Sequence, residues 1–342
     1  MAVTLQQIAQ EAGVSRGTVD RALNNRGRIR PEVAENIKRI AEELGYQPSL
    51  AGRALVMARR KLKIGVILQS SETPFMKQVL EGIQAARQEV EKLGGTVDIE
   101  EIEEVNPKEA INRIIRMRDE PVHGIALSGA EDQLLRRTVD ECVREYGIPV
   151  VTFNGDLDGT ERMCYVGQDA GKSGVVAAGL MGEIVGEGTV AVISGHPTNP
   201  ALNERACGFC RTLTELCPKA NVLESRYAYD DDWVSEKMTE ELIGNYPELN
   251  GIYVTGSGGV GVCRALERAG KSEKIKVIAN DFLEDNLNWL KRGVINFLIG
   301  QDAYVQGYEP VMLLFRKLFE NMEPEREYHY TDIVIKTKYN VE

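Results

Sequence analysis

Side chains that could bind a polyhydroxylated ligand follow several of the strands predicted from the sequence. They include hydroxyls, carboxylates, amides, aromatic rings and one guanidinium. Such a mixture suits a polyol, whose hydroxyls need charge-assisted and bidentate hydrogen bonds and whose C–H faces stack on rings. The candidates, in chain order, are Ser70, Ser71, Glu72, Thr73, Phe75, Ser128, Glu131, Asn154, Asp156, Asn203, Arg205, Trp233, Thr255, Ser257, Asp281 and Gln301.

A glycine-rich stretch, GSGGVG from Gly256 to Gly261, suggests a second chemistry. It follows a predicted strand, opens a predicted helix, and has Asp281 twenty residues beyond its last glycine. On paper this is a dinucleotide-binding fingerprint, so an NAD-dependent dehydrogenase is one alternative. Its position argues against that reading, because the fingerprint belongs in the first strand–helix turn of such a domain. This loop comes several strands into the second half of the body, and we expect no cofactor.

The cysteines and histidines do not form a catalytic or metal-binding pattern. Cys207 and Cys210 make a C-x-x-C inside a predicted helix, with no second such pair elsewhere. We interpret them as buried, reduced thiols, in line with the irregular spacing of all six cysteines. The three histidines, His123, His196 and His329, are far apart and lack a catalytic signature. We therefore expect no metal, no catalytic residue and no enzyme activity.

Alternating strands and helices position the polar candidates. This rhythm predicts parallel sheets with helices on both faces, and the polar loop 154–162 divides it into two doubly wound lobes. Ligands bind beyond the carboxyl ends of such strands, so two facing edges would form a cleft. The predicted strands are 64–68, 96–102, 122–127, 148–153, 188–193, 221–227, 250–254, 275–279 and 296–300. The predicted helices are 75–92, 107–117, 133–146, 169–185, 200–216, 232–244 and 259–269.

The first 25 residues predict two short helices joined by a turn. Thr4 and Gln7 form a capping-box pattern at the first helix, and Gly13 ends it. Ser15 is a suitable cap for the second helix. Two such helices bury little surface, but the second can project side chains into a DNA major groove. A third helix is predicted from Pro31.

These motifs closely resemble the LacI/GalR family of bacterial transcription regulators. The resemblance is carried by A-x-x-A-G-V-S-x-x-T-V-x-R-x-L-N (Ala9 to Asn24) and by I-x-x-x-A-E-E-L-G-Y-x-P (Ile37 to Pro48). It covers the whole chain in layout. It implies an α/β protein with an N-terminal three-helix helix-turn-helix headpiece and a two-lobed, periplasmic-binding-protein-like, doubly wound body.

The resemblance also implies domain boundaries. The headpiece is expected at 1–47, a hinge helix or linker at 48–62, and the effector-binding and dimerisation domain at 63–342. Lobe 1 would comprise about 63–156 and 302–324, and lobe 2 about 164–300 and 326–340. In the family the chain crosses between lobes three times, so we expect 303–320 to return to the first lobe. Residues 328–336 would then close the sheet of the second.

For DNA, the resemblance implies an inverted-repeat operator read by a homodimer. Arg16, Gly17 and Arg21 match positions that face the major groove in the family, and Leu55 matches its minor-groove leucine. Asp20 departs from the family pattern, in which serine is usual. The predicted DNA-binding residues are Thr4, Ser15, Arg16, Gly17, Thr18, Arg21, Asn24, Arg28, Ser49 and Leu55.

For the cleft, the resemblance implies a small sugar-like effector. The guanidinium of Arg205 and the carboxylate of Asp281 are expected to face each other across the cleft. Thr255-Gly256 replaces the Asn-Asp of many relatives, and Asn154 is often Asp in them, which leaves the identity of the sugar open. The predicted effector-binding residues are Thr73, Phe75, Asn154, Arg205, Trp233, Thr255, Asp281 and Gln301.

Charge is divided unevenly along the chain. Residues 1–63 hold 12 Lys/Arg against 6 Asp/Glu, and the remaining residues hold 29 against 46. A basic head on an acidic body is typical of a protein with one surface for a polyanion. No apolar run approaches ~18 residues and no signal peptide pattern is present, so we expect a cytoplasmic protein without membrane contact. The lack of a signal peptide pattern and the presence of the headpiece argue against the other alternative, a solute-binding protein of a transport system.

Overall fold

The computed structural model describes residues 3–23, 29–46, 61–120 and 122–341. The chain divides into two compact units, Met1–Arg60 and Lys61–Glu342. We refer to them as the headpiece and the body.

Three helices pack around a small apolar core in the headpiece. Ile8, Val19 and Ile37 are fully buried at its centre, one from each helix. The predicted capping box is confirmed: Thr4 N–H donates to Gln7 Oε1 at 2.8 Å, and Thr4 Oγ1 accepts from Gln7 N–H. The helices are α1 (Leu5–Glu11), α2 (Arg16–Leu23) and α3 (Pro31–Glu43).

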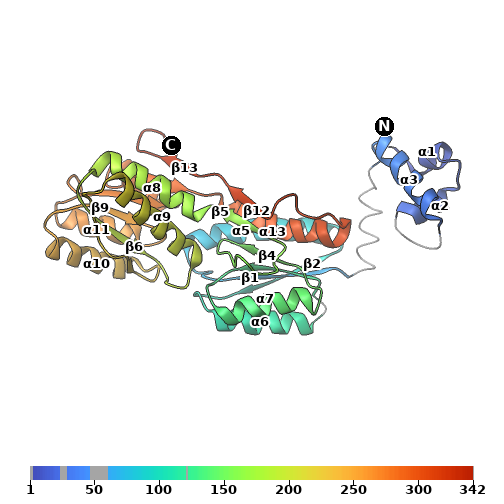
Figure 1. Cartoon of the computed structure of the whole chain (residues 1–342), viewed down its shortest axis with the longest axis horizontal. Helices are drawn as coiled ribbons and strands as arrows, with labels where there is room; N and C mark the ends of the chain where they lie inside the picture. The colour runs from blue at the N-terminus through green and yellow to red at the C-terminus, as the bar shows by residue number, and fades with distance from the viewer. Residues whose placement is uncertain (1–2, 24–28, 47–60, 121, 342) are drawn as a thin grey trace. The chain divides into compact units, whose positions relative to one another are not determined.

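The first lobe of the body is a six-stranded, all-parallel sheet with the order β12-β5-β4-β3-β1-β2. Helices α6 and α7 cover one face, and α5 and α13 cover the other (Figure 1). The elements are β1 (Lys63–Leu68), α5 (Pro74–Lys92), β2 (Thr96–Glu101), α6 (Pro107–Asp119), β3 (Gly124–Ser128), α7 (Gln133–Arg144), β4 (Val150–Phe153), β5 (Cys164–Gln168), α13 (Ala303–Phe315), the π-helical turn Arg316–Glu320, and β12 (Tyr328–Thr331).

The second lobe is a seven-stranded sheet with the order β13-β11-β10-β9-β6-β7, and β8 also pairs with β6. Alternate residues of its strands enter two separate cores, as period-2 side chains require: Ile252 faces α10–α12, and Tyr253 faces α8 and α9. The elements are α8 (Ala170–Val185), β6 (Thr189–Ser194), α9 (Pro200–Leu216), β7 (Asn221–Val222), β8 (Arg226–Tyr227), α10 (Asp232–Asn245), β9 (Leu249–Val254), α11 (Gly259–Arg268), β10 (Lys276–Asn280), α12 (Glu284–Lys291), β11 (Phe297–Gly300) and β13 (Val334–Lys336).

The chain crosses between the two sheets three times, as predicted: after β5, after β11 and after β12. Two expected details are wrong. Residues 164–168 and 328–331 were assigned to the second lobe, but β5 and β12 pair with each other in the first sheet. Within 328–336, β13 alone joins the second sheet, where it runs antiparallel to β11. The predicted strand is divided because the chain passes from the first sheet to the second between β12 and β13.

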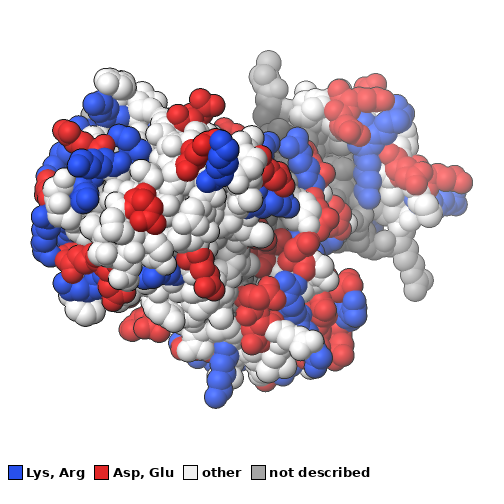
Figure 2. All heavy atoms as spheres, turned by 60° about the vertical axis from the view of Figure 1, so that its left-hand side comes forward, with Lys and Arg blue, Asp and Glu red and all other residues white. Residues whose placement is uncertain are grey.

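Acidic and basic side chains are interspersed on the face of the molecule shown in Figure 2. The body also carries exposed ion pairs, among them Arg87–Glu91 and Lys237–Glu240. Pairs of this kind contribute about 0–1 kcal/mol each to stability. The acidic excess of the body is therefore not gathered into one patch on this face.

A glycine sets the close packing of α5 against α13. An ideal Cβ on Gly307 would lie 1.9 Å from the carbonyl oxygen of Val79. We expect Gly307→Ala to lower the free energy of unfolding by about 1–3 kcal/mol, because α13 must move away from α5. Gly179→Ala in α8 is the matched control, since nothing lies within 4 Å of its ideal Cβ. That change should stabilise the protein by up to ~1 kcal/mol through helix propensity.

Urea unfolding of the two variants beside the parent protein measures both effects. A Gly307→Ala midpoint equal to that of Gly179→Ala would contradict the proposed helix contact.

Candidate functional site

The turn between α1 and α2 orients the second headpiece helix. Gly13 takes a left-handed conformation with φ +64°, and Ser15 Oγ accepts from Thr18 N–H at 3.2 Å. With Val19 and Ala22 buried, Arg16, Gly17 and Arg21 are left exposed on α2. This is the arrangement that the sequence predicted for a helix that reads a major groove.

Arg21 is held within α2 by one hydrogen bond of its side chain. Its Nε donates to the carbonyl oxygen of Gly17 at 3.0 Å. A guanidinium has four further N–H donors, enough for a bidentate contact with a guanine edge. Asn24, Arg28, Ser49 and Leu55 lie outside the described residues, so their predicted contacts with DNA remain predictions.

The unusual Asp20 influences a tyrosine of the same headpiece, Tyr46. Burial raises the pKa of Tyr46, and the negative charge of Asp20 raises it further, while Arg16 opposes the shift. The charges of Asp20 and Arg16 therefore act in opposite directions on Tyr46, which follows α3.

Residues from the two lobes converge on a small cavity at the carboxyl ends of the strands. Its volume is about 40 Å³. Six of the eight predicted effector-binding residues line it: Thr73, Phe75, Asn154, Arg205, Asp281 and Gln301. The other lining residues are Ser70, Met76, Asn199, Ala201, Leu202, Asp230, Gly256 and Ser257.

The backbone around this cavity is strained. Ser70, Asn154, Asp230 and Asp281 all have positive φ, between 55° and 72°. Each follows the end of a strand, namely β1, β4, β8 and β10. Left-handed non-glycine residues cost free energy and cluster at ligand sites, which supports this cavity as the functional one.

Arg205, on α9 of the second lobe, is held by close helix packing and by hydrogen bonds to both lobes. An ideal Cβ on Gly174 would lie 2.1 Å from the carbonyl oxygen of Arg205, so a glycine is needed for α8 to approach α9 this closely. The Arg205 side chain donates to the Thr255 carbonyl oxygen at 2.8 Å and to Gln168 Oε1 at 3.0 Å. Its Nε is buried without a hydrogen-bond partner among the described residues. A buried, unpaired donor lining a cavity is available to a ligand.

Asp281 is buried beside this guanidinium. Burial raises its pKa, while the positive charge of Arg205 and the hydrogen bond from Gln301 lower it. The expectation that Arg205 and Asp281 face each other as partners needs correction. The hydrogen bonds of Arg205 go to Thr255 and Gln168, and both Arg205 and Asp281 belong to the second lobe.

A chain of amides joins the lobes behind the cavity. Asn154 Nδ2 donates to Gln306 Oε1 at 3.3 Å, Gln306 Nε2 donates to Gln301 Oε1 at 2.8 Å, and Gln301 Nε2 donates to Asp281 Oδ1 at 3.0 Å. Gln306, on α13, is fully buried. No local sequence pattern pointed to Gln306, because it lies inside α13, the helix that returns to the first lobe.

Two predicted residues lie elsewhere. Thr255 is fully buried, and its Oγ1 bonds to Ser194 Oγ at 2.9 Å, so it contributes only the carbonyl oxygen that holds Arg205. Trp233 is 66% exposed in the first turn of α10 and is not among the described residues that line the cavity. The structure does not bring its indole to the ligand side chains.

Asp230 is a lining residue that sequence analysis missed. It follows β8, the second half of the single strand predicted over 221–227. The run Asp230-Asp231-Asp232 is typical of a helix start, but Asp231 is the residue that caps α10. Burial raises the pKa of Asp230 to about 6, opposed by the hydrogen bond from the Ser257 backbone and assisted by the charge of Asp281.

The mouth of the cleft is closed. Glu131 N–H, after β3 of the first lobe, donates to the Thr198 carbonyl oxygen of the second lobe at 2.9 Å. Ligand pockets usually enclose about 300–1,000 Å³, so this cavity must enlarge to admit a sugar. Separation of the lobes would enlarge it.

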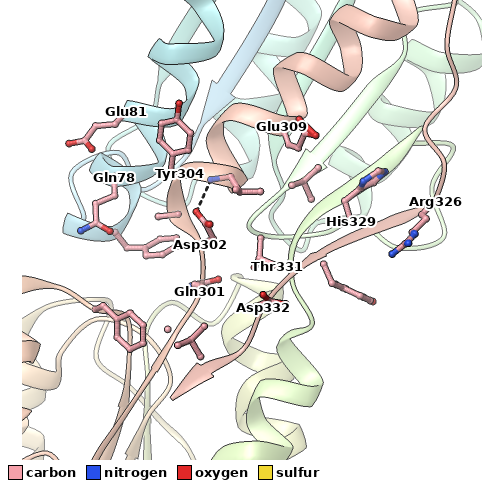
Figure 3. Close-up of a pocket in the computed structure, with 18 of the residues that line it drawn as sticks. Gln78, Glu81, Gln301, Asp302, Tyr304, Glu309, Arg326, His329, Thr331 and Asp332 are labelled. Carbon is pink, nitrogen blue, oxygen red and sulfur yellow. Dashed lines mark hydrogen bonds between the residues drawn. The ribbon is translucent and has the colours of Figure 1, made fainter. Parts of the chain in front are cut away.

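A larger groove of about 890 Å³ lies beside the crossover segments. This groove shares Phe75 and Gln301 with the cavity. Most of its wall consists of helix faces and β12, and few of its lining residues follow the end of a strand. Figure 3 shows side chains around it from α5 (Gln78, Glu81), α13 (Tyr304, Glu309), β12 (His329, Thr331) and the following residue Asp332. We assign the ligand to the smaller cavity, because the strained, polar strand ends meet there.

The glycine-rich loop has a packing role. An ideal Cβ on Gly261 would lie 1.9 Å from the Asp232 carbonyl oxygen, so this glycine lets α11 pack against α10. In the same lobe, the cysteine expectation needs correction: Cys207 is exposed, and Cys210 is partly buried. All six thiols are free. The described part of the chain contains no cluster of metal-ligating side chains and no helix long and apolar enough to span a membrane.

Comparison with protein families defines the class of the body. A model described as periplasmic binding protein domain matches residues 64–321, and one described as bacterial regulatory proteins, lacI family, matches residues 4–49. The body is therefore a periplasmic-binding-protein domain. With its headpiece, the chain belongs to the LacI/GalR family and is a DNA-binding transcriptional regulator.

Individual relatives agree with this assignment. The chain is 24% identical over 337 residues to the ribose operon repressor of Lactococcus lactis, covering 96% of each chain. It is 26% identical over 304 residues to the HTH-type transcriptional regulator CelR of Thermobifida fusca, covering 81% of this chain and 82% of CelR. A solute-binding protein from Burkholderia graminis, solved in complex with D-arabinose, superposes with a TM-score of 0.75 at 26% identity. That match covers 82% of this chain and 96% of the other.

Proposed function

We propose that this protein binds an inverted-repeat DNA operator as a homodimer and that a small sugar-like effector, bound between the lobes, controls its affinity for the operator. The observation that carries the proposal is the convergence of Asn154, from the first lobe, with Arg205 and Asp281, from the second, on one cavity. The arabinose-bound relative and the ribose operon repressor support a sugar as the ligand.

The coupling rests on lobe movement. A ligand that contacts both lobes favours the arrangement in which its contacts are complete, and only this difference in affinity can shift a conformational equilibrium. The amide chain from Asn154 to Asp281 and the Glu131–Thr198 contact both depend on how far apart the lobes lie. The two headpieces of a dimer would then change their spacing.

The homodimer follows from the size of one headpiece. A single recognition helix makes too few contacts for specificity, and operator symmetry mirrors protein symmetry. The body must supply the interface. One face of α5 is exposed and could contact a second copy of the chain; it includes Lys77, Gln84 and Glu91. Light scattering at micromolar concentration should give twice the mass of the chain.

Two other functions fit less well. A transport solute-binding protein would share the body but has no use for a headpiece of the lacI family. An NAD-dependent dehydrogenase would need the glycine loop for its cofactor, whereas Gly261 serves helix packing. We therefore infer that the protein is not an enzyme and that it acts in the cytoplasm, where its operator lies.

A thermal-shift screen of the full-length protein tests the effector. Pentoses, hexoses, polyols and their phosphates would each be added in excess, and a true ligand raises the melting temperature in a concentration-dependent way. We expect at least one of these to bind, with no shift from NADH. A shift with NADH alone would contradict the proposal and favour the dehydrogenase.

A further inference from the structure

We propose that the cleft selects polyhydroxylated ligands that carry no negative charge, and that Asp230 together with Asp281 sets this selectivity. The inference rests on the proposed function, since it names the class of effector bound at the same site. It excludes sugar phosphates and sugar acids, and it favours neutral monosaccharides and cyclic polyols.

The charges that line the cavity carry the argument. Among its described lining residues, the charged side chains are Arg205, Asp230 and Asp281. The lining therefore holds two carboxyl groups against one guanidinium. Each carboxyl group can accept hydrogen bonds from ligand hydroxyls, whereas an anionic ligand would bring a further negative charge close to them in a buried site.

The single positive charge of Arg205 does not balance two carboxyl groups. Its hydrogen bonds to the Thr255 carbonyl oxygen and to Gln168 Oε1 use one N–H of each Nη. Its Nε has no hydrogen-bond partner among the described residues, and it can donate one hydrogen bond to a hydroxyl oxygen of the ligand.

Asp230 is fixed where it meets the ligand. Its backbone is left-handed, with φ +60°, and an ideal Cβ on the neighbouring Gly195 would lie 2.2 Å from Asp230 Oδ1. The carboxylate is therefore confined, and it cannot swing out to solvent without opening the loop. Asp281 is 6% exposed, and its Oδ1 is occupied by Gln301, which leaves Oδ2 for a ligand hydroxyl.

Calorimetry on the full-length protein tests the selectivity with matched probes. The neutral set is D-ribose, D-xylose, D-glucose and myo-inositol, and the anionic set is D-ribose 5-phosphate, D-glucose 6-phosphate, D-gluconate and D-glucuronate. We expect binding within the neutral set and none within the anionic set. For the best neutral probe, Asp230→Asn should weaken binding about 10-fold, because a charge-assisted hydrogen bond becomes a neutral one.

Glu248→Gln is the matched control. Glu248 is an exposed carboxylate of the same lobe, so its variant should bind the probe like the parent protein. The melting temperature of Asp230→Asn without ligand checks that the variant folds. It should not fall, because the substitution removes the repulsion between the carboxylates of Asp230 and Asp281.

Each outcome is decisive. Binding of a sugar phosphate or sugar acid, weakened by Asp281→Asn, would overturn the selectivity while leaving the proposed function intact. Unchanged affinity in Asp230→Asn for a bound neutral sugar would overturn the role of Asp230. If neither set bound, the sugar-effector function itself would fail, and this inference with it.

Discussion

Replacing Arg205 by alanine is expected to leave operator binding intact while abolishing the response to effector. The side chain joins the Thr255 carbonyl oxygen, Gln168 and the cavity, and removal leaves buried polar groups without partners. The contact that the Nε–H would make with the ligand is also lost, and a hydrogen bond to a charged group is worth about 1.5–3 kcal/mol. Effector affinity should therefore fall by at least ~10-fold.

Asp281→Asn should give the same result with less structural damage. It keeps the shape of the side chain and removes the charge beside Arg205. Operator binding by fluorescence anisotropy, measured over a range of effector concentrations, reports both properties in one titration. Arg211→Ala is the control, because Arg211 is an exposed arginine on the same helix α9.

Retention of the parental effector response in both Arg205→Ala and Asp281→Asn would remove the cleft from the mechanism. The chain would still carry the fold and the headpiece of its family, but the ligand would have to bind elsewhere.

Arg21→Ala should have the second large effect, a loss of operator specificity. Arg21 is exposed on α2 and is positioned through its Nε by the Gly17 carbonyl oxygen. A bidentate arginine–guanine contact is worth about 1–3 kcal/mol, and a dimer makes it twice. Operator affinity should drop by at least ~30-fold, whereas weak, salt-sensitive binding to any DNA should persist.

Competition between operator and unrelated DNA at fixed salt measures this specificity. Arg39→Ala provides the control, since Arg39 pairs with Glu43 on the exposed side of α3. An Arg21→Ala protein that still prefers its operator as strongly as the parent would rule out α2 as the recognition helix.

Local sequence patterns predicted most of the fold. The start of α1 was readable from its capping box, Thr4 with Gln7, which the structure shows. The buried strands of both lobes were readable as short apolar runs. Strand β5 and helix α12 were not predicted, and β12 and β13 were merged. The assignment of β5 and β12 to a sheet depends on pairing between residues more than 150 positions apart in sequence, which no local pattern records.

Site residues could be predicted from the sequence where they lie in loops that follow predicted strands. Asn154 and Asp281 were identified because they directly follow strands β4 and β10, and Thr73 because it lies in the loop between β1 and α5. Trp233 failed this test, because one turn of helix α10 carries its indole to the surface. Gln306 and Asp230 were missed because their roles depend on burial and on segments brought together only by folding.

The central claim is that a ligand in the cleft controls DNA affinity in the same molecule. The most direct measurement is the operator dissociation constant of the full-length protein with and without a saturating concentration of the ligand found by the screen. Coupling of about 1–3 kcal/mol predicts a 5- to 150-fold change, absent in Asp281→Asn. The same dissociation constant with and without a ligand that calorimetry shows to be bound would contradict the account.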